Sequence, residues 1–159
     1  MAQIPLIFPD GRPCLRQQSV WFKYQGPQGI PASVDVLIDS GARRCFTHPA
    51  TLAALTSVPL GKINDELADL SRLNRAELEA ILGSHTGPFK IFGTITSITG
   101  KCIGGLSLAG VAVVIGGHPI GKIDLGSTVA TDSVCILGMN FINLVTLTLT
   151  KGRQGCIEV

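Results

Sequence analysis

The residues best suited to chemistry lie in one short stretch from Val34 to Ala42, which reads Val-Asp-Val-Leu-Ile-Asp-Ser-Gly-Ala. An apolar strand pattern runs there directly into an acid, a hydroxyl and a glycine, so a rigid strand would deliver the carboxylate of Asp39 into a tight turn. Such a carboxylate can act as a general acid or base. The alternative is a polar turn in an inactive β domain, because an Asp-Ser/Thr-Gly tripeptide arises by chance in about one chain in ten of this length.

A second segment near the C-terminus sharpens this interpretation. The stretch Val36-Leu-Ile-Asp-Ser-Gly-Ala42, followed later by Ile136-Leu-Gly-Met-Asn-Phe141, resembles the retropepsin-like aspartic proteases of retroviruses, retrotransposons and some cellular proteins. The resemblance covers roughly residues 33–55 and 90–150. Between the two signatures, the glycine-rich run 100–117 is similar to the flap of that family and the strands that follow it.

The resemblance implies a closed β-barrel of the acid protease fold and a role for each residue of the turn. An ionised Asp39 takes a proton from a water molecule, while a protonated partner carboxyl group donates to the carbonyl oxygen of the peptide bond. Ser40 would hydrogen-bond across a twofold axis. Gly41, which lacks a Cβ, lets two turns approach each other and leaves its N–H near the carboxylates. Ala42 would follow toward the substrate cleft, and activity would favour acidic to near-neutral pH.

The sequence contains only one such motif. Asp124-Leu-Gly126 has no hydroxyl residue in its middle position, and Asp132-Ser-Val134 lacks the glycine. The partner carboxyl group must therefore come from a second chain, which predicts a twofold homodimer with an Asp39 from each subunit at its axis. The N-terminal run 4–8 and the C-terminal residues 156–159 are expected to form interleaved edge strands between the two subunits.

A flap that covers the substrate is expected between residues 96 and 105. We place its tip at Ile98, Thr99 and Gly100, because glycine permits the opening that a peptide needs to enter. The competing assignment is Lys-Cys-Ile-Gly-Gly at 101–105. Ile136 and Leu137 are expected to pack in the core and to contribute to the wall of the substrate pocket.

Two neighbourhoods depart from the retroviral pattern. Many retroviral members carry an acidic residue soon after the turn and an arginine after the Ile-Leu/Ile-Gly, whereas this chain has Arg43-Arg44 and Met139. The ion pair that those residues would form is therefore not expected here. The Gly-Met form resembles retrotransposon and cellular versions.

Composition favours one mainly β domain spanning residues 1–159. The chain has 19 Gly and 9 Pro among many Val, Ile and Thr, which is typical of short strands joined by tight turns. The net formal charge of +2 and the scattered basic residues argue against a nucleic-acid partner. Mean hydropathy is high at +0.39, but no run is long enough for a membrane span, and no secretory signal is visible.

The cysteine and histidine residues suggest neither a disulfide framework nor a metal site. The five cysteines have no CxxC spacing, and reduced thiols in a cytoplasmic protein are the favoured interpretation. His48, His85 and His118 are too dispersed for a metal or a triad. We therefore expect no cofactor.

Short helices are expected within the β domain. His48-Pro49 opens a helix over 50–55, and a two-helix insertion is predicted near 60–83. Asn64 could cap the first helix of that insertion, and Asn74-Arg-Ala-Glu77 is a capping box for the second. Strands are predicted at 4–8, 20–24, 34–38, 45–47, 89–98, 102–108, 111–115, 120–125, 128–134 and 144–150.

The favoured function is a homodimeric aspartic endopeptidase that cuts extended peptides, with its own polyprotein as one candidate substrate. The alternative from another class is a catalytically silent dimer that serves as a peptide-binding or assembly module. A β-barrel binding protein with no relation to proteases would instead be a monomer without opposed Asp39 residues.

Overall fold

The computed structural model describes all residues except 1, 96–98, 132 and 151–153, and its described part is mainly β. The strands are β1 Gln3–Pro5, β2 Cys14–Leu15, β3 Val20–Lys23, β4 Gly29–Pro31, β5 Val36–Ile38, β6 Cys45–Phe46, β7 His85–Thr86, β8 Phe89–Ile95, β9 Cys102–Ile115, β10 His118–Ser127, β11 Ile136–Leu137, β12 Thr146–Thr150 and β13 Gln154–Glu158. The α-helices are α1 Pro49–Thr56, α2 Leu60–Ser71, α3 Arg75–Ile81 and α4 Met139–Ile142, and two 3-10 turns are η1 Gln17–Ser19 and η2 Val129–Thr131.

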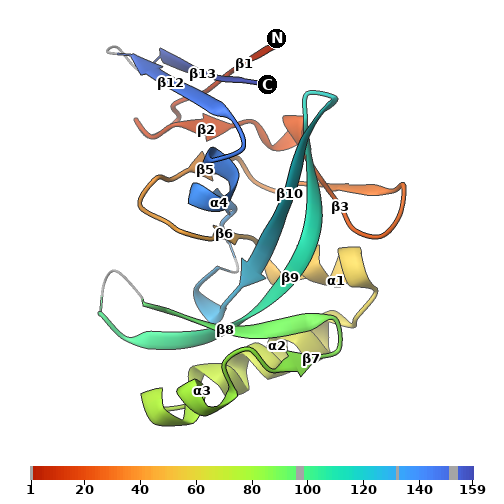
Figure 1. Ribbon diagram of the computed structural model, residues 1–159, viewed down its shortest axis with the longest axis vertical. Coiled ribbons are helices and arrows are strands. Elements are labelled where there is room, and N and C mark those ends of the chain that lie inside the picture. Colours follow the sequence, from red (N-terminus) through yellow and green to blue (C-terminus); the bar gives the residue numbers. More distant parts are fainter. Residues whose placement is uncertain (1, 96–98, 132, 151–153) are drawn as a thin grey trace.

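The long antiparallel hairpin of β9 and β10 runs through the middle of the molecule (Figure 1). The main sheet has the order β2-β5-β11-β6-β10-β9-β3-β4, with β8 pairing β9 and β7 pairing β8. At one end α2 and α3 lie against β8 and β9, and at the other end the two chain termini meet in a separate sheet (Figure 1). The short strands that carry the candidate site lie between these two ends.

One hydrophobic core joins the sheet to the helices. Fully buried side chains from β3, β9, β10 and β11 meet buried leucines and isoleucines of α1 and α2 in a single cluster. Phe22, Phe89 and Phe141 are the largest of these side chains. Burying side chains of this size contributes roughly 1.5–3 kcal/mol each, so the core holds the strands beneath the site in place.

The helical predictions are largely confirmed. The helix opened by His48-Pro49 is α1, and the insertion forms α2 and α3. Asn74 accepts a hydrogen bond from the Glu77 N–H at 2.8 Å, and the Glu77 carboxylate accepts from the Asn74 N–H, which completes the predicted capping box. The cap at Asn64 is wrong, because α2 already begins at Leu60.

Two strand predictions are corrected. The separate strands at 102–108 and 111–115 form one strand, β9, in which Ala109 and Gly110 lie opposite the single residue Asp124 of β10 as a bulge. The described residues of the range 128–134 do not form a strand. The hydroxyl of Thr131 accepts from the Thr128 N–H at 2.8 Å and donates to the Thr128 carbonyl, which favours the 3-10 turn η2 over an extended backbone.

The termini pair within the chain, in the order β1-β13-β12. Ile4 lies opposite Ile157, and Leu147 lies opposite Ile157 on the other side. Both edges of β13 are therefore occupied by strands of the same chain. Within this three-stranded sheet, only the outer edges of β1 and β12 have no paired strand among the described residues. The expectation that the C-terminal residues form an edge strand for interleaving between subunits is therefore corrected.

The described part of the chain contains no helix that combines the length and the apolar character needed to cross a membrane. All five cysteines are free thiols. Cys14, Cys45 and Cys135 are buried, while Cys102 and Cys156 are partly exposed.

Candidate active site

Asp39 follows directly after β5 and is held by the neighbouring strand β11. The two strands are parallel, with Leu37 opposite Ile136 and Ile38 opposite Leu137. The Leu37 N–H donates to the carbonyl of Cys135 at 2.9 Å, and the Asp39 N–H donates to the carbonyl of Leu137 at 3.1 Å. The backbone of Asp39 is thus fixed by the segment that carries the second sequence signature.

The turn after Asp39 orients its carboxylate. The Gly41 N–H donates to Oδ1 of Asp39 at 2.9 Å, and the Ala42 N–H donates to the Asp39 carbonyl at 3.2 Å. Asp39 is half-buried, whereas Ser40 and Gly41 are exposed. A Cβ on Gly41 would lie 3.1 Å from Oδ1 of Asp39, which explains why a residue without a side chain suits this position. The carboxylate is therefore held on one side and open on the other.

Gly138 lets the turn cross over the end of β11. A Cβ at this position would lie 2.4 Å from the Arg44 carbonyl oxygen and 2.5 Å from that of Ala42, so no side chain fits. Beyond the glycine, the Met139 N–H donates to the Ala42 carbonyl at 2.8 Å and the Asn140 N–H donates to the Arg43 carbonyl at 3.1 Å. The two signatures are thus joined by main-chain hydrogen bonds.

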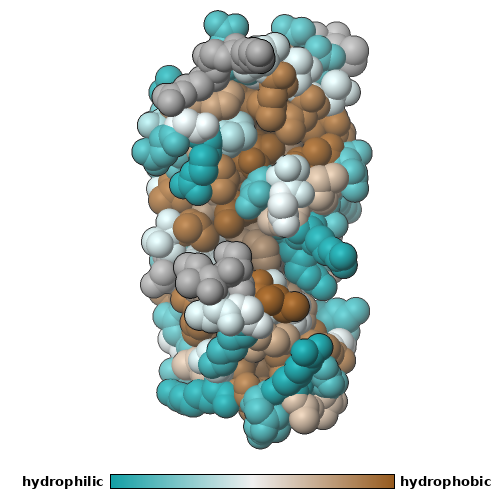
Figure 2. Space-filling model, turned by 90° about the vertical axis from the view of Figure 1, so that its left-hand side faces the viewer, coloured by the Kyte–Doolittle hydropathy of each residue, from teal (hydrophilic) through white to brown (hydrophobic). Residues whose placement is uncertain are grey.

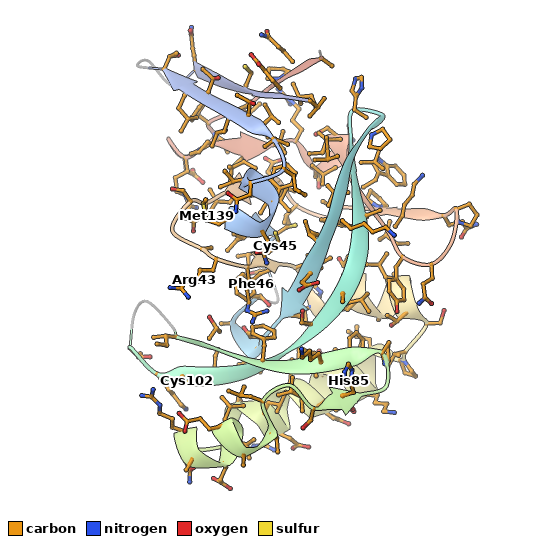
Figure 3. The ribbon with its side chains drawn as sticks, in the orientation of Figure 1. Arg43, Cys45, Phe46, His85, Cys102 and Met139 are labelled. Atoms are coloured by element: carbon orange, nitrogen blue, oxygen red, sulfur yellow. The ribbon has the colours of Figure 1, made fainter. Side chains whose placement is uncertain are left out.

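Arg43 and Arg44, the basic pair after the turn, lie in different environments. Arg43 is exposed, and in Figure 3 its side chain is directed toward the side on which the β8–β9 hairpin lies. Arg44 is half-buried, and its guanidinium carbon lies 4.7 Å from the centre of the Phe92 ring. The ion pairs among the described residues lie elsewhere, on α2 and α3.

The hairpin of β8 and β9 positions the predicted flap residues. The last described pair of this hairpin joins Ile95 to Cys102, and the described residues 99–101 belong to the loop before β9. Thr99 and Gly100 lie in this loop, and Gly100 has a φ of 66°. Ile98 lies outside the described residues. The competing tip at 101–105 is wrong for its last four residues, because they belong to β9.

The predicted pocket-wall residues differ in exposure. Ile136 is half-buried and lies opposite Phe46 of β6. Leu137 is fully buried and belongs to the core cluster, so in this chain it supports the turn from beneath without a surface of its own.

A cavity of about 340 Å³ lies beside the carboxylate, and sequence reasoning missed part of its lining. Asp39 and Ser40 share it with residues of the terminal sheet and of the segment before β2; the lining is Arg12, Pro13, Leu37, Ile38, Asp39, Ser40, Leu147 and Leu149. The alternation of Val145, Leu147 and Leu149 with threonines is typical of a strand with one buried face, yet Leu149 is 53% exposed. Figure 2 shows that hydrophobic residues are concentrated in the upper half of the face displayed there.

The thiols near the turn remain protonated around neutral pH. Burial raises the pKa of Cys45 to about 11, and burial raises the pKa of Cys135 to about 12. Neither thiol is a ready nucleophile, since the thiolate is the reactive form. No group of three or more His, Cys, Asp or Glu residues within the described ranges is arranged to hold a metal ion.

Comparisons with known proteins identify the fold. No protein-family model matches the sequence, and no curated protein matches it. Among solved structures, it is similar to a retropepsin-like aspartic protease from Rickettsia conorii, with a TM-score of 0.53 and 14% identity over 98% of this chain and 90% of that chain. A likeness at this identity is evidence of architecture, not of activity. The chain therefore has the fold of the retropepsin-like aspartic proteases.

Proposed function

We propose that residues 1–159 form a single domain that is one half of a homodimeric aspartic endopeptidase. The observation that carries the proposal is the presentation of Asp39, whose backbone is fixed by β11 and whose carboxylate accepts the Gly41 N–H while its other side stays open. A carboxylate held this firmly at the surface is preorganised for proton transfer. The retropepsin-like fold supports the same conclusion.

The proposed reaction needs two such carboxyl groups that share one proton. The ionised carboxylate removes a proton from a water molecule, and the water oxygen forms a bond to the peptide carbonyl carbon. The protonated carboxyl group of the second Asp39 donates its proton to the carbonyl oxygen. Collapse of the tetrahedral diol breaks the C–N bond: the protonated carboxyl group gives its proton to the leaving nitrogen, and the ionised carboxylate removes a proton from a diol hydroxyl, which restores the shared proton.

The outer edge of β12 is the proposed contact between the two copies. The Leu6 N–H donates to the Gly155 carbonyl and the Val159 N–H to the Ala2 carbonyl, so alternate residues of β13 face β1 and the others face β12. The opposed pairs then leave the N–H and C=O groups of Leu147 and Leu149 directed outward. This edge carries no charge or proline, whereas Pro5 removes a donor from the outer edge of β1.

Pairing at β12 suits the Asp39 site for a geometric reason. Leu147 and Leu149 line the same cavity as Asp39 and Ser40. A second copy placed on this edge would cover the exposed leucine and bring its own turn toward the first. Ser40 would then hydrogen-bond across the axis, and Thr99 and Gly100 of the hairpin loop would close over an extended peptide as part of a flap.

Three finer assignments belong to the same proposal. Met139 in place of an arginine favours the retrotransposon or cellular type. The five free thiols favour a reducing compartment such as the cytoplasm. The polyprotein from which such a domain is released is a candidate substrate.

The test compares Asp39→Asn with Asp65→Asn on a peptide library between about pH 4 and pH 7. Asp65 is exposed on α2, away from the candidate site, so its substitution removes the same charge without touching the turn. We expect Asp39→Asn to abolish cleavage and Asp65→Asn to leave it unchanged. Wild-type cleavage no greater than that of Asp39→Asn would overturn the proposal, and a dimer that binds these peptides without cutting them would identify the silent module instead.

A further inference from the structure

We propose that the cavity containing Arg44 binds an acidic side chain of the substrate, so that the enzyme prefers peptides with a glutamate near the scissile bond. The inference rests on the proposed function and names the substrate class of the same site. The cavity has a volume of about 390 Å³, and it lies between the segment that follows the Asp39 turn and the edge of the hairpin. Arg44, Lys90, Phe92 and Asp124 line it together with residues from the other face of β8 and from the end of α3.

The cavity lies at the outer edge of β8 and is lined from both faces of the hairpin, one of which carries Lys90 and Phe92. Side chains alternate along β8, so Lys90 and Phe92 share one face, while Ile91 and Gly93 share the other. A Cβ on Gly93 would lie 3.5 Å from Leu78 of α3, which assigns that second face to the helices. The ring of Phe92, in contrast, lies 6.1 Å from the ring of Phe46 in β6. A peptide that runs beneath the hairpin from Asp39 therefore passes the face that carries Lys90 and Phe92.

The guanidinium group of Arg44 is positioned to bind a carboxylate. Its guanidinium group is held over the Phe92 ring at 4.7 Å, and its side chain makes no hydrogen bond or ion pair with another described residue. A guanidinium group stacked in this way keeps its N–H donors available at the edge, where they match the two oxygens of a carboxylate. Because Arg44 is half-buried, such a bond would be screened less than a bond at the open surface.

The charges around the cavity favour an anion. Arg44 and Lys90 supply two positive groups, and Asp124 supplies one negative group. Asp124 is exposed at the bulge of β9 and β10 and forms no ion pair with either base within the described chain. An acidic side chain can therefore enter without displacing a resident partner, although Asp124 weakens its attraction.

The test uses two peptide libraries that differ only in a glutamate or a glutamine fixed at each position in turn. At one position close to the cleaved bond, the wild-type enzyme should cleave the glutamate peptides with a kcat/KM roughly tenfold higher, as expected for one charge-assisted hydrogen bond. Arg44→Gln should abolish this preference. Asp124→Asn should increase it, and that variant leaves the stack of Arg44 on Phe92 intact.

The matched control is Arg43→Gln, which removes the same charge from the adjacent exposed residue that does not line the cavity. It should keep the preference for glutamate. Wild-type enzyme that cleaves both libraries equally, or an equal loss of preference in Arg43→Gln and Arg44→Gln, would overturn the inference. Thermal unfolding of each variant identifies any that fails to fold.

A binding assay separates this inference from the proposed function. Fluorescence anisotropy measures how tightly labelled glutamate and glutamine peptides bind to Asp39→Asn and to the double variant with Arg44→Gln. Preference for glutamate that depends on Arg44, in a protein whose wild type cuts no peptide, would support the cavity and reject the protease. Cleavage without any dependence on Arg44 would support the protease and reject the cavity.

Discussion

The turn that carries Asp39 and the outer edge of β12 line the same cavity, but they are built in opposite ways. Main-chain hydrogen bonds between the two sequence signatures fix the turn. The two segments cross closely at Gly138, where no side chain would fit. The edge of β12 has no paired strand among the described residues, and its Leu149 is 53% exposed. The chain is thus rigid around the carboxylate and open where a second copy would complete the site.

The largest effect is expected from Gly138→Ala. The added Cβ would meet two carbonyl oxygens of the backbone, which cannot move without breaking the turn. We expect a loss of about 4 kcal/mol or more in the free energy of unfolding, measured by urea denaturation. Gly61→Ala in α2 is the control, because its Cβ would meet nothing within 4 Å and should stabilise the helix by roughly 0.5–1 kcal/mol. Similar stability of the two variants would contradict the close crossing.

At the outer edge of β12, a substitution is expected to change dimerisation more than folding. Leu149→Asp should change the monomer's free energy of unfolding by less than about 1 kcal/mol, since about half of the Leu149 side chain is already exposed to solvent. It should raise the dissociation constant of the dimer roughly a hundredfold, because a carboxylate would be buried in an apolar contact. Sedimentation measures the mass of each variant. Leu60→Asp, at a side chain 39% exposed on α2, should remain as dimeric as the wild type. An unchanged mass for Leu149→Asp would exclude β12 as the contact.

The pH dependence of the free energy of unfolding tests the buried segments beside the Asp39 turn, which contain Cys45 and Cys135, separately from the dimer contact. Burial raises the pKa of Cys45 to about 11, and that of Cys135 to about 12, from an ordinary value of 9.0. The unfolded chain therefore loses these protons at lower pH than the folded chain. Their stabilising contribution is complete below about pH 9 and falls as the pH rises toward 11 and 12. Urea midpoints between pH 8 and 11 should decline less steeply in a variant with Cys45→Ala and Cys135→Ala, and equal slopes would contradict this account.

The smallest effect on stability is expected from Gly41→Ala. Its Cβ would lie 3.1 Å from Oδ1 of Asp39, at an exposed position where the carboxylate can turn aside. We expect a change of less than about 1 kcal/mol in the free energy of unfolding. Peptide cleavage should fall by tenfold or more, because the orientation of Asp39 is lost. Full activity in this variant would show that the hydrogen bond from Gly41 is dispensable.

Local chemistry explains which parts of the fold could be predicted from the sequence. The capping box at Asn74 depends on residues three positions apart, and the turn at Asp39 depends on a strand that ends in an acid, a hydroxyl and a glycine. Both patterns are complete within a short segment. The cap at Asn64 was wrong because α2 begins at Leu60, after Pro59 as its N-cap.

The remaining features depend on residues that are distant in sequence. The cavity at Arg44 combines β8, β9 and β10 with the turn, and periodicity cannot indicate such a combination. The pairing of β1 with β13 inside one chain was not predicted either, since an edge strand has the same sequence whether its partner is internal or external. The turn η2 replaced a predicted strand because the Thr131 hydroxyl forms hydrogen bonds with the backbone of Thr128.

The proposed function requires that two copies of Asp39 make one site. The most direct test is peptide cleavage per chain as the wild-type protein is diluted, with the mass in solution measured by sedimentation at the same concentrations. Activity per chain should fall in parallel with the fraction of dimer, and Leu149→Asp should lose activity at concentrations where the wild type keeps it. Constant activity per chain in a protein that sediments as a monomer would contradict the claim.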